Sequence, residues 1–507
     1  MLLKCTQDIG FHDIKGNYYP SVRRWIYMKK KGLKVLAAAA MLTMGMMTMS
    51  AYAAEGWSMS NNSWVYLDKN GTKVTDEWRK GADNLWRYLN SSGEMAINTW
   101  VDDDYYVDSN GIMVSNQWVW TRPLYGDDSE QYWFYFGSSG KVVKEGWKKI
   151  DGKSYLFDSD GIMETGWSED ELYYLGQDGA MKTGWRYIEP PTDEFNDEED
   201  WYDDYDGEYS SDGKYWFYFA SNGKKYCPQT GTDESADFRI SRIDGKYYCF
   251  DEYGIMRTGW VYLNGDPDDA PVDSIENWRY FAGEEIQNAT LGASIQGWLS
   301  LEPPERLQDN MDEPVVWYFF NKDGSPEVGP DYGTASTTDF TRINGNNYLF
   351  DPKGNPVSGL HEIEIGSTDE KTAYYFDEDS KTALKGKKTI EEGDGTKSTF
   401  YFNEGSYAGR GVTGVKDNYL YYKGKRQEAD SDVRYTLISI PDGEDTYKTY
   451  AVNSSGRITK NKTVKDGDGV KYTTNSVGIV IEIDGEPINN NSSYGDPIEP
   501  VFEEWDY

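Results

Sequence analysis

Residues 146–185 read GWKKIDGKSYLFDSDGIMETGWSEDELYYLGQDGAMKTGW, and this stretch contains two copies of one short unit. Each copy has a Gly-Trp pair, an aromatic run, a turn that ends in Gly, a Met and a closing Thr-Gly-Trp. Trp147, Trp167 and Trp185 are 20 and 18 residues apart, and a fixed period near 20 is typical of repeat proteins. One such unit cannot bury its aromatic side chains alone, so we expect further units on both sides.

The same unit recurs towards the N-terminus, where Trp57, Trp78, Trp100 and Trp118 are 21, 22 and 18 residues apart. Between them lie short aromatic runs that end in the turns DKNG, NSSG and DSNG. Alternating aromatic runs closed by Asx-Gly turns predict β-hairpins, with these turns at the hairpin tips. No window shows the 3.6-residue apolar period of a helix, so we predict an all-β repeat solenoid of stacked two-stranded hairpins.

A longer repeat overlies the short one. The runs WFYF, WFYF and WYFF begin at Trp133, Trp216 and Trp317, and each precedes an Ile-Asx-Gly triplet, 93 and 100 residues apart. Acidic, Pro-bearing insertions separate these blocks, and their charge density predicts mobile, solvated loops. The insertions are Glu189–Asp212, Asn264–Asn277 and Glu302–Pro314.

The N-terminus has the pattern of an export signal. Lys29, Lys30, Lys31 and Lys34 precede an apolar run of signal-peptide length, and Ala51-Tyr52-Ala53 fits the usual cleavage pattern. The run is too short for the roughly 20 residues of a membrane span, so we expect no stable span after signal cleavage. We therefore expect a secreted protein.

Six segments follow from these patterns. They are a non-structural N-terminal extension (1–27), a signal peptide (28–53), regular repeats (54–185), compound repeats with acidic insertions (186–360), degenerate C-terminal β repeats (361–487) and a disordered tail (488–507).

Composition argues against several classes of function. The net charge of −36 excludes nucleic acid and anionic lipid as expected partners. His361 is the single histidine after the leader, and we expect it on the surface beside a turn. One histidine leaves no Cys/His metal site and no Ser-His-Asp triad, so we predict no catalytic residues, no metal and no cofactor. A glycosidase that uses two carboxylates needs a cleft, which a chain of hairpins does not predict.

The Gly-Trp units resemble the cell-wall-binding repeats of Gram-positive surface proteins, which include choline-binding modules and glucan-binding repeats. The resemblance is strong over residues 56–185 and around Trp260. It implies hairpins wound into a left-handed superhelix, with ligands held between neighbouring hairpins. The resemblance implies non-covalent attachment to the cell wall or cell surface, with a cell-wall polymer or glycan as partner. Choline is one implied ligand, because aromatic faces attract quaternary ammonium groups, and sugars stack on the same faces.

The resemblance assigns ligand contacts to the aromatic residues of the units and to two methionines at the floor of the sites. These candidates are Trp64, Trp78, Trp86, Trp100, Trp118, Trp133, Trp147, Trp167, Trp185, Trp260, Tyr106, Tyr174, Met163 and Met181. Packing between stacked hairpins is the alternative role for each Trp. Asp104, Ser154 and Leu172 stand where choline modules carry a Trp, which argues against choline specificity in those units.

Two further alternatives stay open at this point. A host-glycan adhesin or toxin-like module uses the same repeats, and a wall hydrolase accessory requires a C-terminal domain that the sequence does not reveal. Cys227 and Cys249 lie 22 residues apart, about one unit, so in an exported protein either a disulfide or two free thiols is compatible with the spacing.

Overall fold

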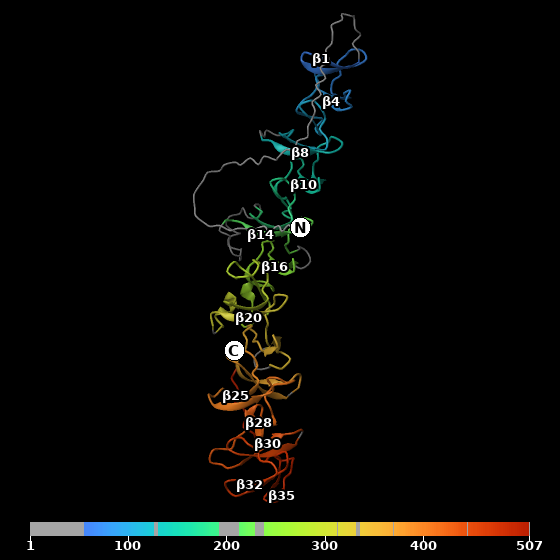
Figure 1. Ribbon diagram of the computed structural model, residues 1–507. Coiled ribbons are helices and arrows are strands. Elements are labelled where there is room, and N and C mark those ends of the chain that lie inside the picture. The colour runs from blue at the N-terminus through green and yellow to red at the C-terminus, as the bar shows by residue number, and fades with distance from the viewer. Residues whose placement is uncertain are drawn as a thin grey trace, which may run out of the picture. The chain divides into compact units, whose positions relative to one another are not determined.

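The computed structural model describes residues 55–125, 130–191, 212–228, 238–311, 313–330, 335–368, 370–443 and 445–505. Over these residues the fold is all-β, as predicted, with only the one-turn helices η1 (Pro267–Asp269) and α2 (Glu305–Gln308) (Figure 1). Neither helix has the length or apolar character that crossing a bilayer requires. The predicted signal peptide lies outside the described residues.

The chain divides into two units, each described by itself: residues 55–101 with 107–113, and residues 102–106 with 114–505. In the first unit β1 pairs with β2, and β3 pairs with β4. Its strands are β1 (Gly56–Ser60), β2 (Ser63–Leu67), β3 (Glu77–Lys80), β4 (Trp86–Leu89) and β5 (Thr99–Val101), and β6 (Tyr105–Val107) falls at the boundary.

The second unit begins with nine consecutive antiparallel pairs, β7–β8 to β23–β24. These strands are β7 (Gln117–Thr121), β8 (Tyr132–Phe136), β9 (Gly146–Ile150), β10 (Lys153–Phe157), β11 (Gly166–Trp167), β12 (Tyr174–Leu175), β13 (Gly184–Ile188), β14 (Tyr215–Phe219), β15 (Arg239–Ile243), β16 (Lys246–Phe250), β17 (Gly259–Tyr262), β18 (Trp278–Phe281), β19 (Gly297–Leu301), β20 (Val316–Phe320), β21 (Thr341–Ile343), β22 (Asn346–Tyr348), β23 (Gly359–Glu364) and β24 (Lys371–Phe376).

Larger sheets follow in the C-terminal part of this unit. A five-stranded sheet has the order β25-β26-β29-β28-β27, β30 pairs with β31, and a four-stranded sheet runs β32-β33-β34-β35. The strands are β25 (Gly386–Glu391), β26 (Lys397–Phe402), β27 (Gly414–Lys416), β28 (Tyr419–Tyr422), β29 (Lys425–Arg426), β30 (Thr436–Pro441), β31 (Tyr447–Val452), β32 (Thr463–Lys465), β33 (Lys471–Thr474), β34 (Val480–Ile483) and β35 (Glu486–Pro487).

The hairpin tips are not the turns that close the aromatic runs, such as DKNG, NSSG and DSNG, which were predicted there. The tip between β9 and β10 is Asp151-Gly152, in which both residues have positive φ (48° and 85°), and the triplets at Ile243 and Ile343 form tips in the same way. Two positive φ angles match the twist of a two-residue hairpin. The Asx-Gly turns instead follow the second strand, where the Gly161 amide donates to the Asp158 carbonyl at 3.1 Å and the chain turns back to pair Met163 with Phe157.

A residue with positive φ lies at the start of the first strand or just before it. This holds both in units that have the Gly-Trp pair and in units that lack its Gly. Gly166 and Gly184 have φ of 86° and 74° in Gly-Trp units. Where another residue replaces that Gly, the preceding Asp76, Asn98 or Asn116 takes the positive φ, at 45–50°. Asn and Asp tolerate this region best among residues with a Cβ, so the bend survives the loss of Gly.

The regular hairpins around residues 133–181 are linked to their neighbours by a main-chain hydrogen bond and by a half-buried methionine side chain. The Met163 amide, beyond β10, donates to the Trp133 carbonyl of β8 at 2.9 Å, and the Met181 amide donates to Ser154 in the same way. The Met163 side chain lies beneath the next turn, so that a Cβ at Gly179 would come 2.1 Å from its sulfur. The two methionines therefore pack beneath the turns, and their contact with a ligand stays a prediction.

The core is a row of aromatic side chains from one face of each hairpin. Phe134 and Phe136 of β8 are fully buried, and Phe217 and Phe219 of β14 repeat this arrangement. Neighbouring residues on the strands point to opposite faces, so Trp133 and Tyr135 lie on the other side. This alternation leaves each hairpin with one buried face and one face available for contacts.

Two acidic insertions are folded, which corrects the prediction of mobile loops for Asn264–Asn277 and Glu302–Pro314. Ile275 and Leu307 are fully buried in a core cluster with Tyr262 and Trp278. Apolar residues of each insertion cover the face of the β17–β18 hairpin that carries Tyr262 and Trp278. The described acidic residues of the two insertions remain exposed to solvent. Most of the first insertion lies outside the described residues.

The C-terminal segment is ordered from residue 488 to 505, so the prediction of a disordered tail is wrong over these residues. It runs back along the chain, and the end marked C lies nearer β25 than β35 (Figure 1). The Glu503 amide donates to the Leu360 carbonyl at 2.9 Å, and the Trp505 ring stacks on His361 at 4.2 Å. His361 is thus buried, with 4% exposed, and not on the surface as predicted.

Cys227 and Cys249 are free thiols in the structure, so a disulfide between them is not formed. Cys249 is fully buried against Val261 and Phe281, and burial raises the pKa of its thiol far above the usual range.

We expect iodoacetamide at pH 8 to label Cys249 only after unfolding, because the thiolate is the reactive form. Peptide mapping by mass spectrometry checks this, and a linked Cys227–Cys249 peptide would contradict the structure.

The Asx-Gly turns provide a matched test of close packing between hairpins. Gly161 and Gly166 both have φ near 85°, so an alanine at either position costs about 1–2 kcal/mol in backbone strain. Only at Gly161 would the new Cβ also meet the Val143 carbonyl oxygen, at 3.0 Å, and there is open space at Gly166. Gly161→Ala should lower the urea midpoint more than Gly166→Ala, and equal shifts would show that the turns are not tightly packed.

Candidate ligand-binding site

The accessible face of the β7–β8 hairpin is wholly aromatic at its centre. The strand register pairs Trp118 with Tyr135 and Trp120 with Trp133, which places all four side chains on the face opposite Phe134. Trp120 and Trp133 are 49% and 37% exposed. Large exposed aromatic surfaces of this kind often mark sites that bind a ligand or a partner protein.

Two of these indoles meet at a right angle. The Trp118 and Trp133 ring centroids are 6.4 Å apart, with an interplanar angle of 89°. Tyr155 of the next hairpin packs on Trp118 at 4.9 Å and 64°. We call this set an aromatic corner: a first-strand Trp, a second-strand Trp and a Tyr from the following hairpin.

The corner recurs in the β13–β14 hairpin with nearly the same geometry, and the β19–β20 hairpin has a Trp at each equivalent register position. In the β13–β14 hairpin, Trp185 and Trp216 are 6.3 Å apart at 82°, and Tyr248 of the next hairpin lies 4.8 Å from Trp185 at 60°. In the β19–β20 hairpin, Trp298 packs on Tyr348 at 5.3 Å and 55°, and Trp317 is 56% exposed. The register thus places Trp133, Trp216 and Trp317 at equivalent positions of their hairpins.

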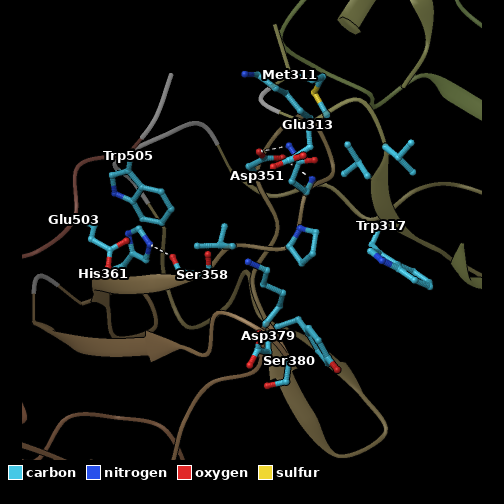
Figure 2. A pocket seen from close by; sticks show the side chains of 18 of the residues that line it. Met311, Glu313, Trp317, Asp351, Ser358, His361, Asp379, Ser380, Glu503 and Trp505 are labelled. Carbon is cyan, nitrogen blue, oxygen red and sulfur yellow. Dashed lines mark hydrogen bonds between the residues drawn. The ribbon is translucent and has the colours of Figure 1, made fainter. Parts of the chain in front are cut away.

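The third corner opens into a cavity of about 610 Å³ that the C-terminal segment helps to line (Figure 2). Trp298, Trp317 and Tyr348 provide aromatic faces, and Glu503 and Trp505 form part of the wall. A cavity of this size is in the range of small-molecule binding sites and exceeds what a single trimethylammonium group needs.

Carboxylates dominate the polar lining of this cavity. Glu313, Asp351, Asp379, Glu503 and Glu504 outnumber Lys353 and Lys381. Burial raises the pKa of the Asp351 carboxyl, partly offset by hydrogen bonds from the Asn355 amide groups at 2.7 and 2.8 Å. The lining thus combines aromatic faces with negative charge, which suits a cationic or hydroxyl-rich ligand.

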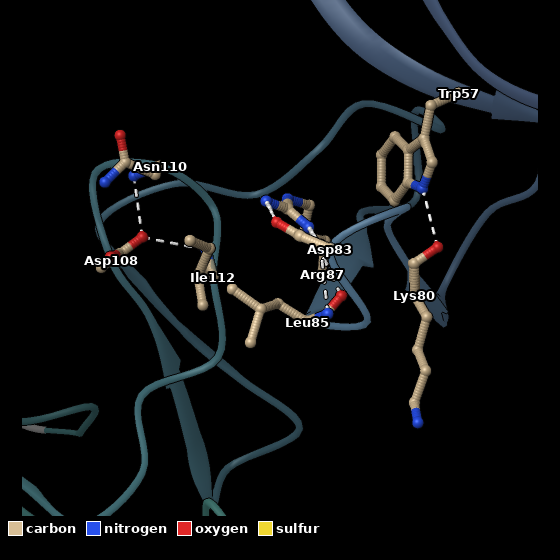
Figure 3. A network of polar contacts seen from close by, with 8 residues as sticks. All are labelled: Trp57, Lys80, Asp83, Leu85, Arg87, Asp108, Asn110 and Ile112. Atoms are coloured by element: carbon tan, nitrogen blue, oxygen red, sulfur yellow. Dashed lines mark hydrogen bonds and ion pairs between the residues drawn. The ribbon is translucent and has the colours of Figure 1, made fainter. Parts of the chain in front are cut away.

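In the first unit, residues at equivalent positions of the repeat make polar contacts (Figure 3). Arg87 stands where the second unit has the corner Tyr, and its hydrogen bonds to Asp83 lower the pKa of that carboxyl to about 2. The Trp57 indole donates to the Lys80 carbonyl at 3.0 Å. The Lys80 ammonium itself lies over the Trp86 ring, 4.8 Å from its centroid.

The structure divides the predicted site residues into three groups by exposure. Trp64, Trp86, Trp133 and Trp147 are exposed; Trp78, Trp100, Trp118, Trp167, Trp185, Trp260, Tyr174, Met163 and Met181 are half-buried; Tyr106 is buried. The predicted residues that the structure brings into a corner are Trp118 with Trp133, and Trp185 and Trp260 in corners of their own. Trp147 has no second indole, because Ser154 stands in that place.

Several corner residues were missed by the sequence analysis. They are Trp120, Trp216, Trp278, Trp298, Trp317, Tyr155, Tyr248, Tyr318 and Tyr348. The signal was present, because Gly297-Trp298 is a Gly-Trp pair and Trp216 and Trp317 begin aromatic runs equivalent to that of Trp133. The tyrosines carried no such signal, since their role depends on which hairpin they face.

Comparison with known families identifies the repeat. Residues 54–100 and 144–184 match the family model of the choline-binding repeat, which confirms the resemblance seen in the sequence. These segments include the Trp64 and Trp86 hairpins and the Trp147 and Trp167 units.

Curated relatives match over limited lengths. Glucosyltransferase-S of Streptococcus mutans is 28% identical over 157 residues, which is 23% of this chain and 11% of that protein. A putative endo-beta-N-acetylglucosaminidase of Streptococcus pneumoniae is 23% identical over 116 residues, 22% of this chain and 16% of the relative. The chain thus spans less than a fifth of the length of either relative.

Among solved structures, the modular autolysin LytC of Streptococcus pneumoniae, in complex with a synthetic peptidoglycan ligand, is 20% identical with a TM-score of 0.34 and covers 60% of this chain and 52% of its own. CbpJ of the same species is 20% identical with a TM-score of 0.30, covering 66% of this chain and all of its own. The choline-binding domain of CbpL from the same species is 22% identical with a TM-score of 0.27, covering 42% and 94%.

Substitution of two adjacent residues on β8, one on each face of the hairpin, measures how much each face contributes to the unfolding free energy. Phe134→Ala removes a fully buried ring and should cost about 3–5 kcal/mol of unfolding free energy. Trp133→Ala should cost less, because 37% of the side chain is already exposed. Urea unfolding of the two variants measures the difference, and equal losses would assign Trp133 to the core.

Proposed function

Because residues 54–100 and 144–184 are repeats of the choline-binding type, we propose that this chain is a secreted, non-catalytic protein that binds cell-wall or surface glycopolymers. The candidate polymers are choline-bearing teichoic acid, a peptidoglycan-linked polymer and a glucan. Binding occurs at the aromatic corners, on hairpins wound into a left-handed superhelix. The predicted signal peptide delivers the protein to the wall, where it is held without a covalent bond.

The right-angled indole pair is the observation that carries this proposal. A quaternary ammonium group offers no hydrogen-bond donor, so several aromatic faces around it are the main means of recognition, worth about 0.5–2 kcal/mol per contact. Trp118 and Trp133 offer two such faces at 89°, with Tyr155 beside them. A sugar ring can stack on the same faces through its C–H groups.

The protein's own ammonium groups already use this chemistry. The Lys225 nitrogen lies 5.2 Å from the Trp167 ring centroid, and Lys80 lies 4.8 Å from that of Trp86. Equivalent indoles that carry no lysine therefore suit an external cation. The net charge of −36 adds a long-range attraction for cationic groups on the ligand.

A glucan is the second candidate ligand, favoured by the size of the cavity at the third corner. About 610 Å³ accommodates a unit larger than choline, and its carboxylates can accept hydrogen bonds from sugar hydroxyls. The relative with 28% identity is a glucosyltransferase. Choline and glucan probes therefore belong in the same experiment.

A retention experiment with the full chain tests the proposal. We expect the protein to be retained on choline resin, choline-bearing teichoic acid, purified peptidoglycan or dextran. Combined Trp133→Ala, Trp216→Ala and Trp317→Ala changes should weaken retention, whereas Tyr407→Ala, which removes an aromatic ring that is 67% exposed outside the corners, should not. Retention on none of the four matrices would refute the function.

Polymer length provides a second measurement. Each corner alone should bind weakly, because a few contacts must offset the ligand's lost freedom. Several corners on one polymer raise the effective concentration, so affinity for a polymer should exceed that for its monomer by about 100-fold or more. Titration of Trp fluorescence with choline chloride and with choline-bearing teichoic acid measures both values. Equal affinity per ligand group would rule out multivalent binding.

A further inference from the structure

Five first-strand tryptophans of the second unit fall into two distinct orientations against a Phe of the next hairpin. At the three corners described above, the indole stacks on a Phe of the next hairpin. Trp118, Trp185 and Trp298 lie 5.7, 5.9 and 5.9 Å from these rings, with interplanar angles of 25°, 27° and 30°. Among the described residues no hydrogen bond from these three indole nitrogens is found.

Trp167 and Trp260 adopt the second orientation. Their rings are tilted by 45° and 41° against the equivalent Phe rings. Each indole N–H donates to a main-chain carbonyl of the following hairpin, to Glu189 from Trp167 and to Glu302 from Trp260, both at 2.9 Å. These two tryptophans are thus tied to the protein main chain through a group that the other three leave available to a ligand.

At Trp167 a lysine of the following hairpin packs on the indole, and among the described residues no second indole stands beside it. Lys225 stands where the preceding unit has Met181; its amide donates to the Leu172 carbonyl at 2.8 Å, and its aliphatic chain lies beneath Gly254. The side chain is only 8% exposed, and its ammonium group rests on the indole. The hollow beside this ring, about 490 Å³, is lined by Tyr187 and Pro190 and not by a second indole.

At Trp260 the folded insertions occupy the corner. Trp278 stands at the position of the second-strand Trp by register, and Tyr318 is the Tyr of the next hairpin, so all three corner residues are present. However, Trp278 is only 4% exposed, because Ile275 and Leu307 pack in the same cluster. This corner is complete in sequence but closed in structure.

The other hairpins between the available corners, β9–β10 and β15–β16, each lack at least one of the two corner tryptophans. Ser154 replaces the second indole in β9–β10, and Ile240 stands at the first-strand position of β15–β16, opposite Cys249. The available corners in the described part of the second unit are therefore those of β7–β8, β13–β14 and β19–β20. Two hairpins separate each available corner from the next.

We propose that the second unit binds its polymer at every third hairpin, and that the chain itself fills or dismantles the corners in between. This inference rests on the proposed function and specifies its regulation. The partner is a long, flexible polymer whose ligand groups reach corners two hairpins apart, and a short oligomer whose groups are adjacent can engage only one corner. Lys225 and the insertions thereby set the number of binding points.

The number of sites can be counted by isothermal titration of the full chain with choline chloride, and with isomaltotriose in parallel. We expect Trp133→Ala, Trp216→Ala and Trp317→Ala each to lower the number of bound ligands by one. Trp278→Phe, which alters the closed corner but keeps a ring in the core, should leave the number unchanged. A loss of one site in Trp278→Phe would overturn the inference without affecting the proposed function.

A gain of binding provides the stricter test. The double variant Leu172→Trp with Lys225→Met supplies the missing indole and removes the ammonium group from Trp167, so one further ligand should bind. Met fits this place, because Met181 occupies the equivalent position beneath Gly223. Leu172→Trp with Lys224→Met is the matched control, since the exposed Lys224 is the neighbouring residue, and it should gain nothing.

The outcomes distinguish the two proposals. A wild-type chain that binds neither probe would overturn the proposed function and this inference together. A wild-type chain that binds, with no additional site in the Leu172→Trp, Lys225→Met protein when its circular dichroism matches that of wild type, would overturn the inference alone.

Discussion

A two-stranded hairpin of about ten residues cannot bury an aromatic face unless another hairpin covers it, and this constraint determines most of the structure. Phe134 and Phe136 are fully buried on one side of β8, and the Met163 amide of the next unit bonds to the Trp133 carbonyl of the same strand. Each unit is thus completed by its neighbour. The stability of such a chain is mainly a sum of nearest-neighbour contacts, as in other repeat proteins.

The first-strand tryptophan contributes to the fold, because it packs on the following hairpin. When its N–H bonds to the main chain, as in Trp167, the ring belongs to the fold. When it stacks on a Phe and meets a second indole at a right angle, as in Trp118, part of its surface remains available. The role of a Trp in this fold is therefore decided by its neighbours rather than by its own place in the repeat.

This dependence also explains which predictions from the sequence succeeded. The 20-residue period, the strands and the Gly turns are local properties, and the structure confirms an all-β chain of hairpins. The tips were misassigned because two candidate turns occur in each unit, and only pairing register distinguishes Asp151-Gly152 from the turn at Gly161. Burial of Ile275, Leu307 and His361 was missed because each depends on contacts with distant segments, which periodicity does not reveal. The Gly297-Trp298 corner could have been identified, whereas its Tyr348 wall could not.

The C-terminal segment shows how the fold continues where the tryptophans end. From β23 onward, Leu360 occupies the first-strand position, so the indole that joins one hairpin to the next is absent there. The chain compensates with main-chain contacts from residues 488–505. The buried Gln427 amide both donates to and accepts from Ile498, at 2.9 and 2.7 Å, in the manner of a strand partner, and Glu392 accepts from the Val501 amide at 2.7 Å. Polar side chains that are buried must be hydrogen-bonded, so these residues require the segment to be in place. The same segment ends at the third corner, where Trp505 stacks on His361. The packing of the C-terminal sheets and the wall of that cavity therefore depend on one continuous stretch of chain.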